Sequence, residues 1–122
     1  MFKIEKSTIH LTRGDSAIIE VKVKNDDGTD YAFKKGESIR FTIVEAKKVE
    51  EIVLTKETQI EKESLSVEVP LLSEETTIGQ IINKPKKYWY EVVLITGSEE
   101  QTILGYDDEG PKELILYPEA QE

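Results

Sequence analysis

Three consecutive aromatic residues, Tyr88, Trp89 and Tyr90, have the clearest capacity for binding chemistry in this sequence. Their neighbours favour a β-strand, and on a strand Tyr88 and Tyr90 share one face while Trp89 takes the other. Exposed aromatic rings can stack on sugar rings or anchor a protein interface. The interpretation we favour places Trp89 in the core against Phe41, with the tyrosines over the sheet surface. The trio remains the candidate set of interface or ligand residues.

The single histidine, His10, is the obvious candidate for acid–base catalysis. It stands between Ile9 and Leu11 in a predicted strand, so alternation directs it away from both and toward solvent. The chain has no Gly-x-Ser-x-Gly motif and no cysteine nucleophile. No pair of carboxylates stands out as the acid and base of a glycosidase. We therefore expect no catalytic residues and a protein that is not an enzyme.

Two acidic turns, residues 25–30 (NDDGTD) and 107–110 (DDEG), offer the oxygen ligands that calcium prefers. A calcium loop starting at Asp26 would end correctly on Glu37, but it would carry Tyr31 where the turn glycine belongs. Asparagine, aspartate and glycine are also ordinary turn residues. We expect structural turns with no metal site, and no cofactor.

Residues 13–15 form the Arg-Gly-Asp tripeptide that integrins recognise. The tripeptide is short enough to occur by chance, and it falls between two predicted strands. Glycine and aspartate serve a tight turn at such a place. The sequence therefore favours a structural turn over an integrin-binding site.

Short strands must position these residues, because the dominant pattern is period-two alternation interrupted by turn residues. Within residues 38–44, Ile39, Phe41 and Ile43 are predicted to point inward. Arg40 and Thr42 are predicted to point outward. The strand-forming runs are residues 9–12, 17–24, 38–44, 52–57, 64–69, 87–95, 101–105 and 112–117.

Two features interrupt the alternation. Residues 73–79 (SEETTIG) begin with a capping serine and end on glycine, which predicts one short helical turn between the sheets. Pro70 is predicted to close the preceding strand. Residues 87–95 are apolar on both faces, which is typical of a central or covered strand.

These elements predict a single domain over residues 1–122, with its core between about residues 8 and 117 and a short polar tail. Seven to eight strands at intervals of roughly ten residues are typical of a sandwich or barrel. The fold class we predict is an all-β, immunoglobulin-like β-sandwich with one helical turn near residues 73–79.

The charge balance limits the partners. The chain has 25 acidic and 16 basic residues and a formal net charge of −9, which opposes binding to nucleic acid and to anionic lipid. No apolar run reaches the roughly 18 residues of a membrane span. The N-terminus alternates apolar and charged residues and lacks the apolar core of a signal peptide. If the protein works outside a cell, we expect it to leave by another route, such as lysis or a dedicated machine.

Several stretches together resemble small proteins and N-terminal domains of phage and prophage tails and baseplates from Gram-positive bacteria, the upper baseplate protein being the nearest type. The resemblance covers about residues 8–117. It is carried by the order and spacing of residues 11–16 (LTRGDS), 27–31 (DGTDY), 35–43 (KGESIRFTI), 72–76 (LSEET) and 88–94 (YWYEVVL).

The resemblance implies an immunoglobulin-like sandwich that assembles with other virion proteins or with copies of itself as a homo-oligomer. It also implies a protein made in the bacterial cytoplasm without a signal peptide and located in the virion when assembled. The upper baseplate protein continues into a helical or fibre segment. A chain ending at Glu122 is therefore expected to be an adaptor, a decoration protein or a separately encoded baseplate piece.

Two other functions stay open. One is a carbohydrate-binding or adhesive immunoglobulin-like module that stacks sugars on its exposed aromatics. The other is an acidic inhibitor or nucleic-acid mimic, suggested by the net charge. Lysines interleave with the acids along the strands, which makes the mimic the weaker of the two.

Overall fold

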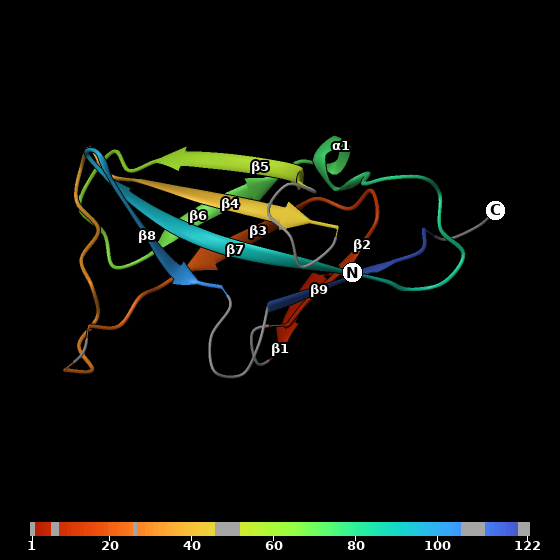
Figure 1. Ribbon diagram of the computed structural model, residues 1–122, viewed down its shortest axis with the longest axis horizontal. Helices are drawn as coiled ribbons and strands as arrows, with labels where there is room; N and C mark the ends of the chain where they lie inside the picture. The colour runs from red at the N-terminus through yellow and green to blue at the C-terminus, as the bar shows by residue number, and fades with distance from the viewer. Residues whose placement is uncertain (1, 6–7, 26, 46–51, 106–111, 120–122) are drawn as a thin grey trace.

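The computed structural model describes residues 2–5, 8–25, 27–45, 52–105 and 112–119, and these residues form an all-β sandwich of two sheets (Figure 1). Within them lie nine strands and one four-residue helix. The elements are β1 (Phe2–Glu5), β2 (Thr8–Thr12), β3 (Ala17–Val21), β4 (Ser38–Val44), β5 (Ile52–Gln59), β6 (Val67–Leu71), α1 (Ser73–Thr76), β7 (Lys86–Thr96), β8 (Glu99–Leu104) and β9 (Lys112–Tyr117).

The large sheet has seven strands in the order β1-β2-β9-β7-β4-β5, with β8 also paired to β7. The eleven-residue strand β7 is its centre. β4 pairs along one side of β7, while β9 and β8 pair along the first and second halves of the other side. The prediction of a central strand here is confirmed. β2 and β9 pair in parallel, and the other pairs are antiparallel.

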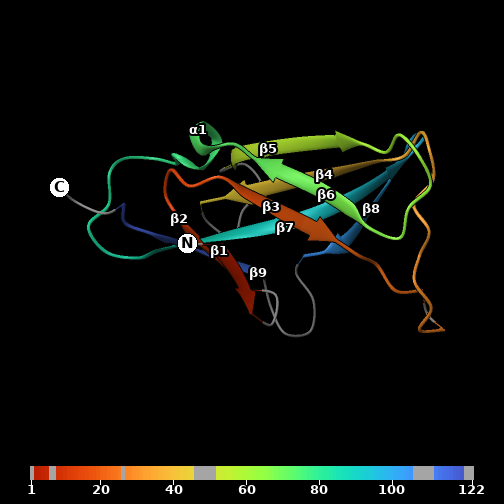
Figure 2. The same ribbon diagram turned by 180° about the vertical axis from the view of Figure 1, so that it is seen from behind.

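The small sheet consists of β3 and β6, paired antiparallel. Figure 2 shows these two strands in front of β4 and β7, so they form the second layer of the sandwich. The chain changes sheet between β2 and β3, β3 and β4, β5 and β6, and β6 and β7. These crossings, with β7 between β4 and β9, make the sandwich immunoglobulin-like in its connections.

The core between the sheets follows from strand alternation. On β4, Ile39, Phe41 and Ile43 are fully buried, as predicted. Phe41 contacts Tyr90 of β7, with ring centroids 5.6 Å apart. Thr42 lies on the opposite face as expected, but it is buried and not exposed to solvent. Its cross-strand neighbours on β5 and β7 shield it from both sides.

The structure changes two details of the expected elements. Pro70 lies inside β6, opposite Ile18 of β3, and does not end the strand. Proline is tolerated there because a two-stranded sheet consists only of edge strands. The N-terminal residues Phe2–Glu5 add strand β1, which was not predicted and which pairs with β2.

The helical turn is shorter than predicted, and Ser73 does not cap it. Leu72 occupies the capping position, and Ser73 is the first helical residue. The side chain of Glu75 accepts a hydrogen bond from the backbone N–H of Leu72 at 2.8 Å. A capping serine would accept a hydrogen bond from the backbone N–H of Glu75, but here that N–H donates to the carbonyl oxygen of Leu72 at 2.8 Å, so the turn closes without a serine at that position.

Candidate functional site

The structure reverses the favoured interpretation of the aromatic trio. Tyr88 and Tyr90 point into the core, with 2 % and 5 % of their surface exposed. Trp89 is on the outer face of the large sheet and is half-buried. Burial raises the pKa of Tyr90 to about 12, as expected for a phenol far from water. Of the three candidates, only Trp89 remains accessible to a partner.

Trp89 is on β7, which has β4 on one side and β9 on the other at this position. Its cross-strand neighbours are Val44 of β4 and Glu113 of β9. The indole nitrogen is buried, so the ring offers part of its apolar surface and not its donor. This geometry suits a partial hydrophobic contact better than open stacking on both faces of the ring.

The arginine of the Arg-Gly-Asp tripeptide is a structural anchor. Arg13 is 7 % exposed, and its guanidinium donates to the carbonyl oxygens of Ile78 at 3.0 Å and Gly79 at 2.8 Å. It also pairs with Glu119. Gly14 adopts a φ of +88°, which glycine tolerates best. The prediction of a structural turn is confirmed, because a buried arginine is not presented to a receptor.

A second buried charged group, Glu37, ties three segments together. Its carboxylate accepts hydrogen bonds from the Tyr31 hydroxyl at 2.6 Å, the Lys34 backbone N–H at 2.6 Å and the Thr96 hydroxyl at 3.0 Å. Burial alone would raise the pKa of Glu37, but these donors outweigh it, so the pKa lies below its ordinary value. The hydrogen bond to Glu37 also raises the pKa of Tyr31 to about 12.

The remaining sequence candidates have structural partners. His10 points away from the core, as predicted, and its Nδ1 is 2.8 Å from the Tyr117 hydroxyl. In the turn at residues 25–30, Asp27 accepts hydrogen bonds from the backbone and side chain of Thr29. Asp26 and the second acidic turn, residues 107–110, lie outside the described residues. Among those described, no three metal-ligating side chains form a group.

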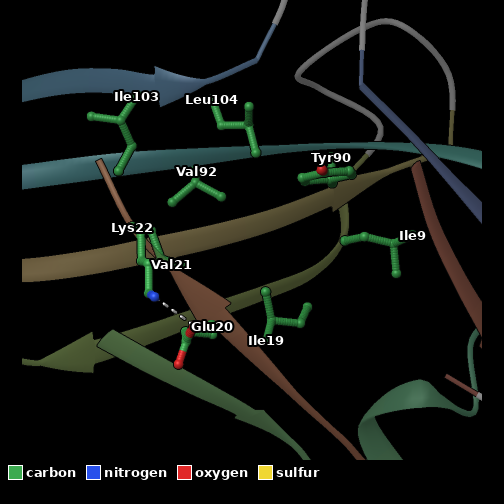
Figure 3. Close-up of a pocket in the computed structure, with 9 residues that line it drawn as sticks. All are labelled: Ile9, Ile19, Glu20, Val21, Lys22, Tyr90, Val92, Ile103 and Leu104. Carbon is green, nitrogen blue, oxygen red and sulfur yellow. Dashed lines mark ion pairs between the residues drawn. The ribbon is translucent and has the colours of Figure 1, made fainter. Parts of the chain in front are cut away.

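A site that the sequence did not indicate lies beside β3. A groove of about 180 Å³ separates the strand from the large sheet, and Figure 3 shows Ile19 and Val21 facing Tyr90 and Val92 across it. Its lining is mostly apolar and comes from β2, β3, β7 and β8. The lining residues are Ile9, Ile19, Glu20, Val21, Lys22, Tyr90, Val92, Ile103 and Leu104.

One ion pair marks the rim of the groove. The Nζ atom of Lys22 lies 3.5 Å from Oε1 of Glu20, and both side chains are more than half exposed. The dashed line in Figure 3 marks this pair on the strand that borders the groove. Consecutive apolar residues at positions 17–19 and 103–104 were the available sequence signal for the groove. The opening itself depends on which strands fail to pair, and alternation does not encode that.

No protein-family model matches the chain, and no curated protein or solved structure does so either. None of the described helices is long and apolar enough to cross a membrane.

Proposed function

We propose that this protein is a structural component of a phage or prophage particle, in the tail or the baseplate. It acts by protein–protein assembly and not by catalysis. The resemblance over residues 8–117 supports the particle, since several motifs follow one another in the order and spacing of tail and baseplate domains. Its partners are other virion proteins or copies of itself.

The observation that carries the assembly role is the open edge of β3 beside an apolar groove. An exposed strand edge offers main-chain donors and acceptors in a row, and a neighbouring chain can bind there by adding a strand. The groove behind the edge supplies the apolar surface that alternate side chains of such a strand require.

The buried polar residues that could suggest another chemistry serve the fold. Arg13 joins the end of β2 to the segment after α1, and Glu37 joins the start of β4 to the end of β7. Both are held by backbone and side-chain partners from separate segments. A sandwich whose segments are joined in this way is a suitable building block for a large particle.

The proposal is tested by mass spectrometry of particles purified on a density gradient after induction of the bacterium that encodes the chain. We expect recovery in constant proportion to the major tail protein, with an abundant cytoplasmic protein as the control for carry-over. A deletion strain should yield particles with a defective tail, and complementation should restore them. Normal particles from the deletion strain would refute the proposal.

A carbohydrate-binding role is the second candidate, favoured by one observation: Trp89 is accessible on the outer face of the large sheet. It is the only tryptophan in the chain, so its fluorescence reports this site alone. Saturable quenching by a cell-wall glycan, together with weaker binding of that glycan to Trp89→Phe in calorimetric titration, would support stacking. Unchanged emission across a panel of glycans would exclude it.

A further inference from the structure

Strand β3 has an edge with no partner strand in the part of the chain that the structure describes. Among the described residues, β3 pairs with β6 and with no other strand, so its second edge faces the groove side of the sandwich. β3 itself ends at Val21, and residues 22–23 lead to an isolated bridge between Lys24 and Asp30, where the carbonyl oxygen of Val23 accepts a hydrogen bond from the Tyr31 N–H at 2.8 Å. The five residues of β3, with the two that follow it, are long enough for one short added strand.

Four other strands, β1, β5, β6 and β8, also pair on one side only among the described residues, and β8 begins with two consecutive glutamates, Glu99 and Glu100. β1 is only four residues long. β6 carries Pro70, which cannot donate a main-chain hydrogen bond. On β5, the ammonium group of Lys56 is held by Glu75, with Nζ–Oε distances of 2.7 and 2.9 Å. β3 has no proline, and an apolar groove lies behind it.

The side chains along this edge are complementary in charge to those on the same edge of a second copy of the chain. When a strand is paired antiparallel with a copy of itself about Val21, Glu20 falls opposite Lys22 of the second copy. Lys22 falls opposite Glu20 of the second copy by symmetry, so the pair occurs twice. On the other face, Ile19 falls opposite Val23 over the groove.

We propose that the free edge of β3 binds the β3 edge of a second copy of this chain, antiparallel and centred on Val21. The two small sheets then form one four-stranded sheet in the order β6-β3-β3-β6. The inference rests on the proposed assembly function and names the partner for one of its surfaces.

The charges select this register over its neighbours. A shift that keeps the same side chains on the groove face moves the centre by one residue. Centring on Glu20 places two glutamates directly opposite each other, which is unfavourable. Centring on Ile19 sets Glu20 against Ile18 and leaves Lys22 without an opposing acid. Only the pairing about Val21 sets both charges against opposite charges.

A charge exchange tests the pairing by sedimentation velocity of the full chain at physiological salt, where long-range repulsion between the acidic copies is screened. Glu20→Lys and Lys22→Glu each create two like-charge pairs and should weaken dimerisation by about tenfold. The double variant restores opposite charges and should return dimerisation to near the wild-type level. Both side chains are more than half exposed, so the fold should tolerate the changes.

Glu68→Lys is the matched control. Glu68 pairs with Glu20 across the two strands of the small sheet, so it lies on the same face but one strand away from the free edge. The variant has the same charge change as Glu20→Lys and relieves the same repulsion between the two glutamates. We expect its dimerisation to equal that of the wild-type chain.

The register is tested by a disulfide. The chain contains no cysteine, so Val21→Cys introduces a single thiol at the proposed two-fold axis. Directly opposed residues in an antiparallel pair have Cα atoms about 4.5–5.5 Å apart, within the range a disulfide spans. We expect a covalent dimer on oxidation, and none from the control Glu68→Cys.

The outcomes separate this inference from the proposed function. A chain that stays monomeric at millimolar concentration, or a dimer indifferent to the charge exchange, overturns self-pairing even if the protein is found in particles. Cross-links from residue 21 to a different virion protein also overturn it, since the occupant is then another chain. A charge-dependent dimer that is absent from particles supports self-pairing and refutes the particle role.

Discussion

The two sheets of this sandwich differ in how completely other parts of the same chain pair with their strand edges and bury their faces. In the large sheet, β7 has paired strands along both sides and buried residues on both faces, Val92 toward the core and Val93 away from it. In the small sheet, β3 has one paired neighbour and one buried face. Ile18 on its outer face is 54 % exposed.

This difference indicates that the large sheet contributes most of the folding stability and that the small sheet offers the surface for association. Interior strands gain hydrogen bonds and apolar burial from within the chain, so they determine the free energy of unfolding. A strand with a free edge and an adjacent groove contributes less to the monomer and leaves groups available to a neighbour. Four changes test this division, from the largest expected effect to the smallest.

The largest effect should come from the core of the large sheet. Phe41→Ala removes a fully buried ring that packs on Tyr90. We expect a loss of about 3–5 kcal/mol in the free energy of unfolding, measured by urea denaturation, because a cavity remains. Phe41→Leu is the milder control. A loss below about 1 kcal/mol would show that the two sheets are not packed as described.

The second-largest loss of stability should come from Arg13, which joins the end of β2 to the segment after α1. Arg13→Ala leaves the carbonyl oxygens of Ile78 and Gly79 without their charged donor, and we expect a loss of about 2–3 kcal/mol. Arg40→Ala is the control, since its pair with Glu100 is solvent-exposed and should be worth less than about 1 kcal/mol. Equal losses in the two variants would contradict the anchoring role of Arg13.

Glu37 and two tyrosines give the sandwich a pH dependence at both ends of the pH range. The pKa of Glu37 is lowered in the folded state, so its contribution is present above the ordinary value of 4.5 and is lost as pH falls through the folded pKa. Tyr31 and Tyr90 have pKa values raised from 10.0 to about 12. Their contribution is complete below pH 10 and is lost as pH rises toward 12.

Glu37→Gln should cost about 1–2 kcal/mol at neutral pH, since an amide cannot accept all three hydrogen bonds, and it should flatten the acid limb of the stability curve. Tyr31→Phe should reduce the alkaline loss and leave the part due to Tyr90. Urea midpoints from pH 3 to pH 11 measure both limbs, with Glu99→Gln as an exposed control. An unchanged acid limb in Glu37→Gln would assign the acid sensitivity to other carboxylates.

The smallest effect should come from the exposed face of the small sheet. Ile18→Ala should change the free energy of unfolding by less than about 0.5 kcal/mol, because the side chain is largely in water. Its neighbour Ile19 is 4 % exposed and is the matched control, with an expected loss of about 2–4 kcal/mol on substitution by alanine. Similar losses at the two positions would mean that both faces of β3 are covered in solution.

Much of the fold could be predicted from local pattern. The runs around residues 38–44 and 112–117 match β4 and β9, because regular alternation and bounding turn residues are local properties. Gly97, with a φ of +61°, lies in the turn of the hairpin between β7 and β8, and glycine is a turn signal that can be read locally. The predicted serine cap was wrong because Leu72 occupies the capping position, and its own carbonyl oxygen accepts the hydrogen bond from the Glu75 N–H.

The candidate site could be predicted less well. Alternation separates Trp89 from Tyr88 and Tyr90, but it does not say which set faces the core when both are aromatic. The groove residues, such as Ile103 and Val21, come from strands far apart in the chain. Their proximity depends on long-range pairing, which a run of residues does not specify.

The sequence by itself determined an acidic, cysteine-free β chain with its turns and its inward and outward sets of side chains, because composition and period-two alternation act locally. Only the tertiary structure decided that the tyrosines of the aromatic trio fill the core, that Arg13 anchors the segment after α1, and that β3 keeps a free edge. Each depends on which strands become neighbours, and that choice is made by burial over the whole chain.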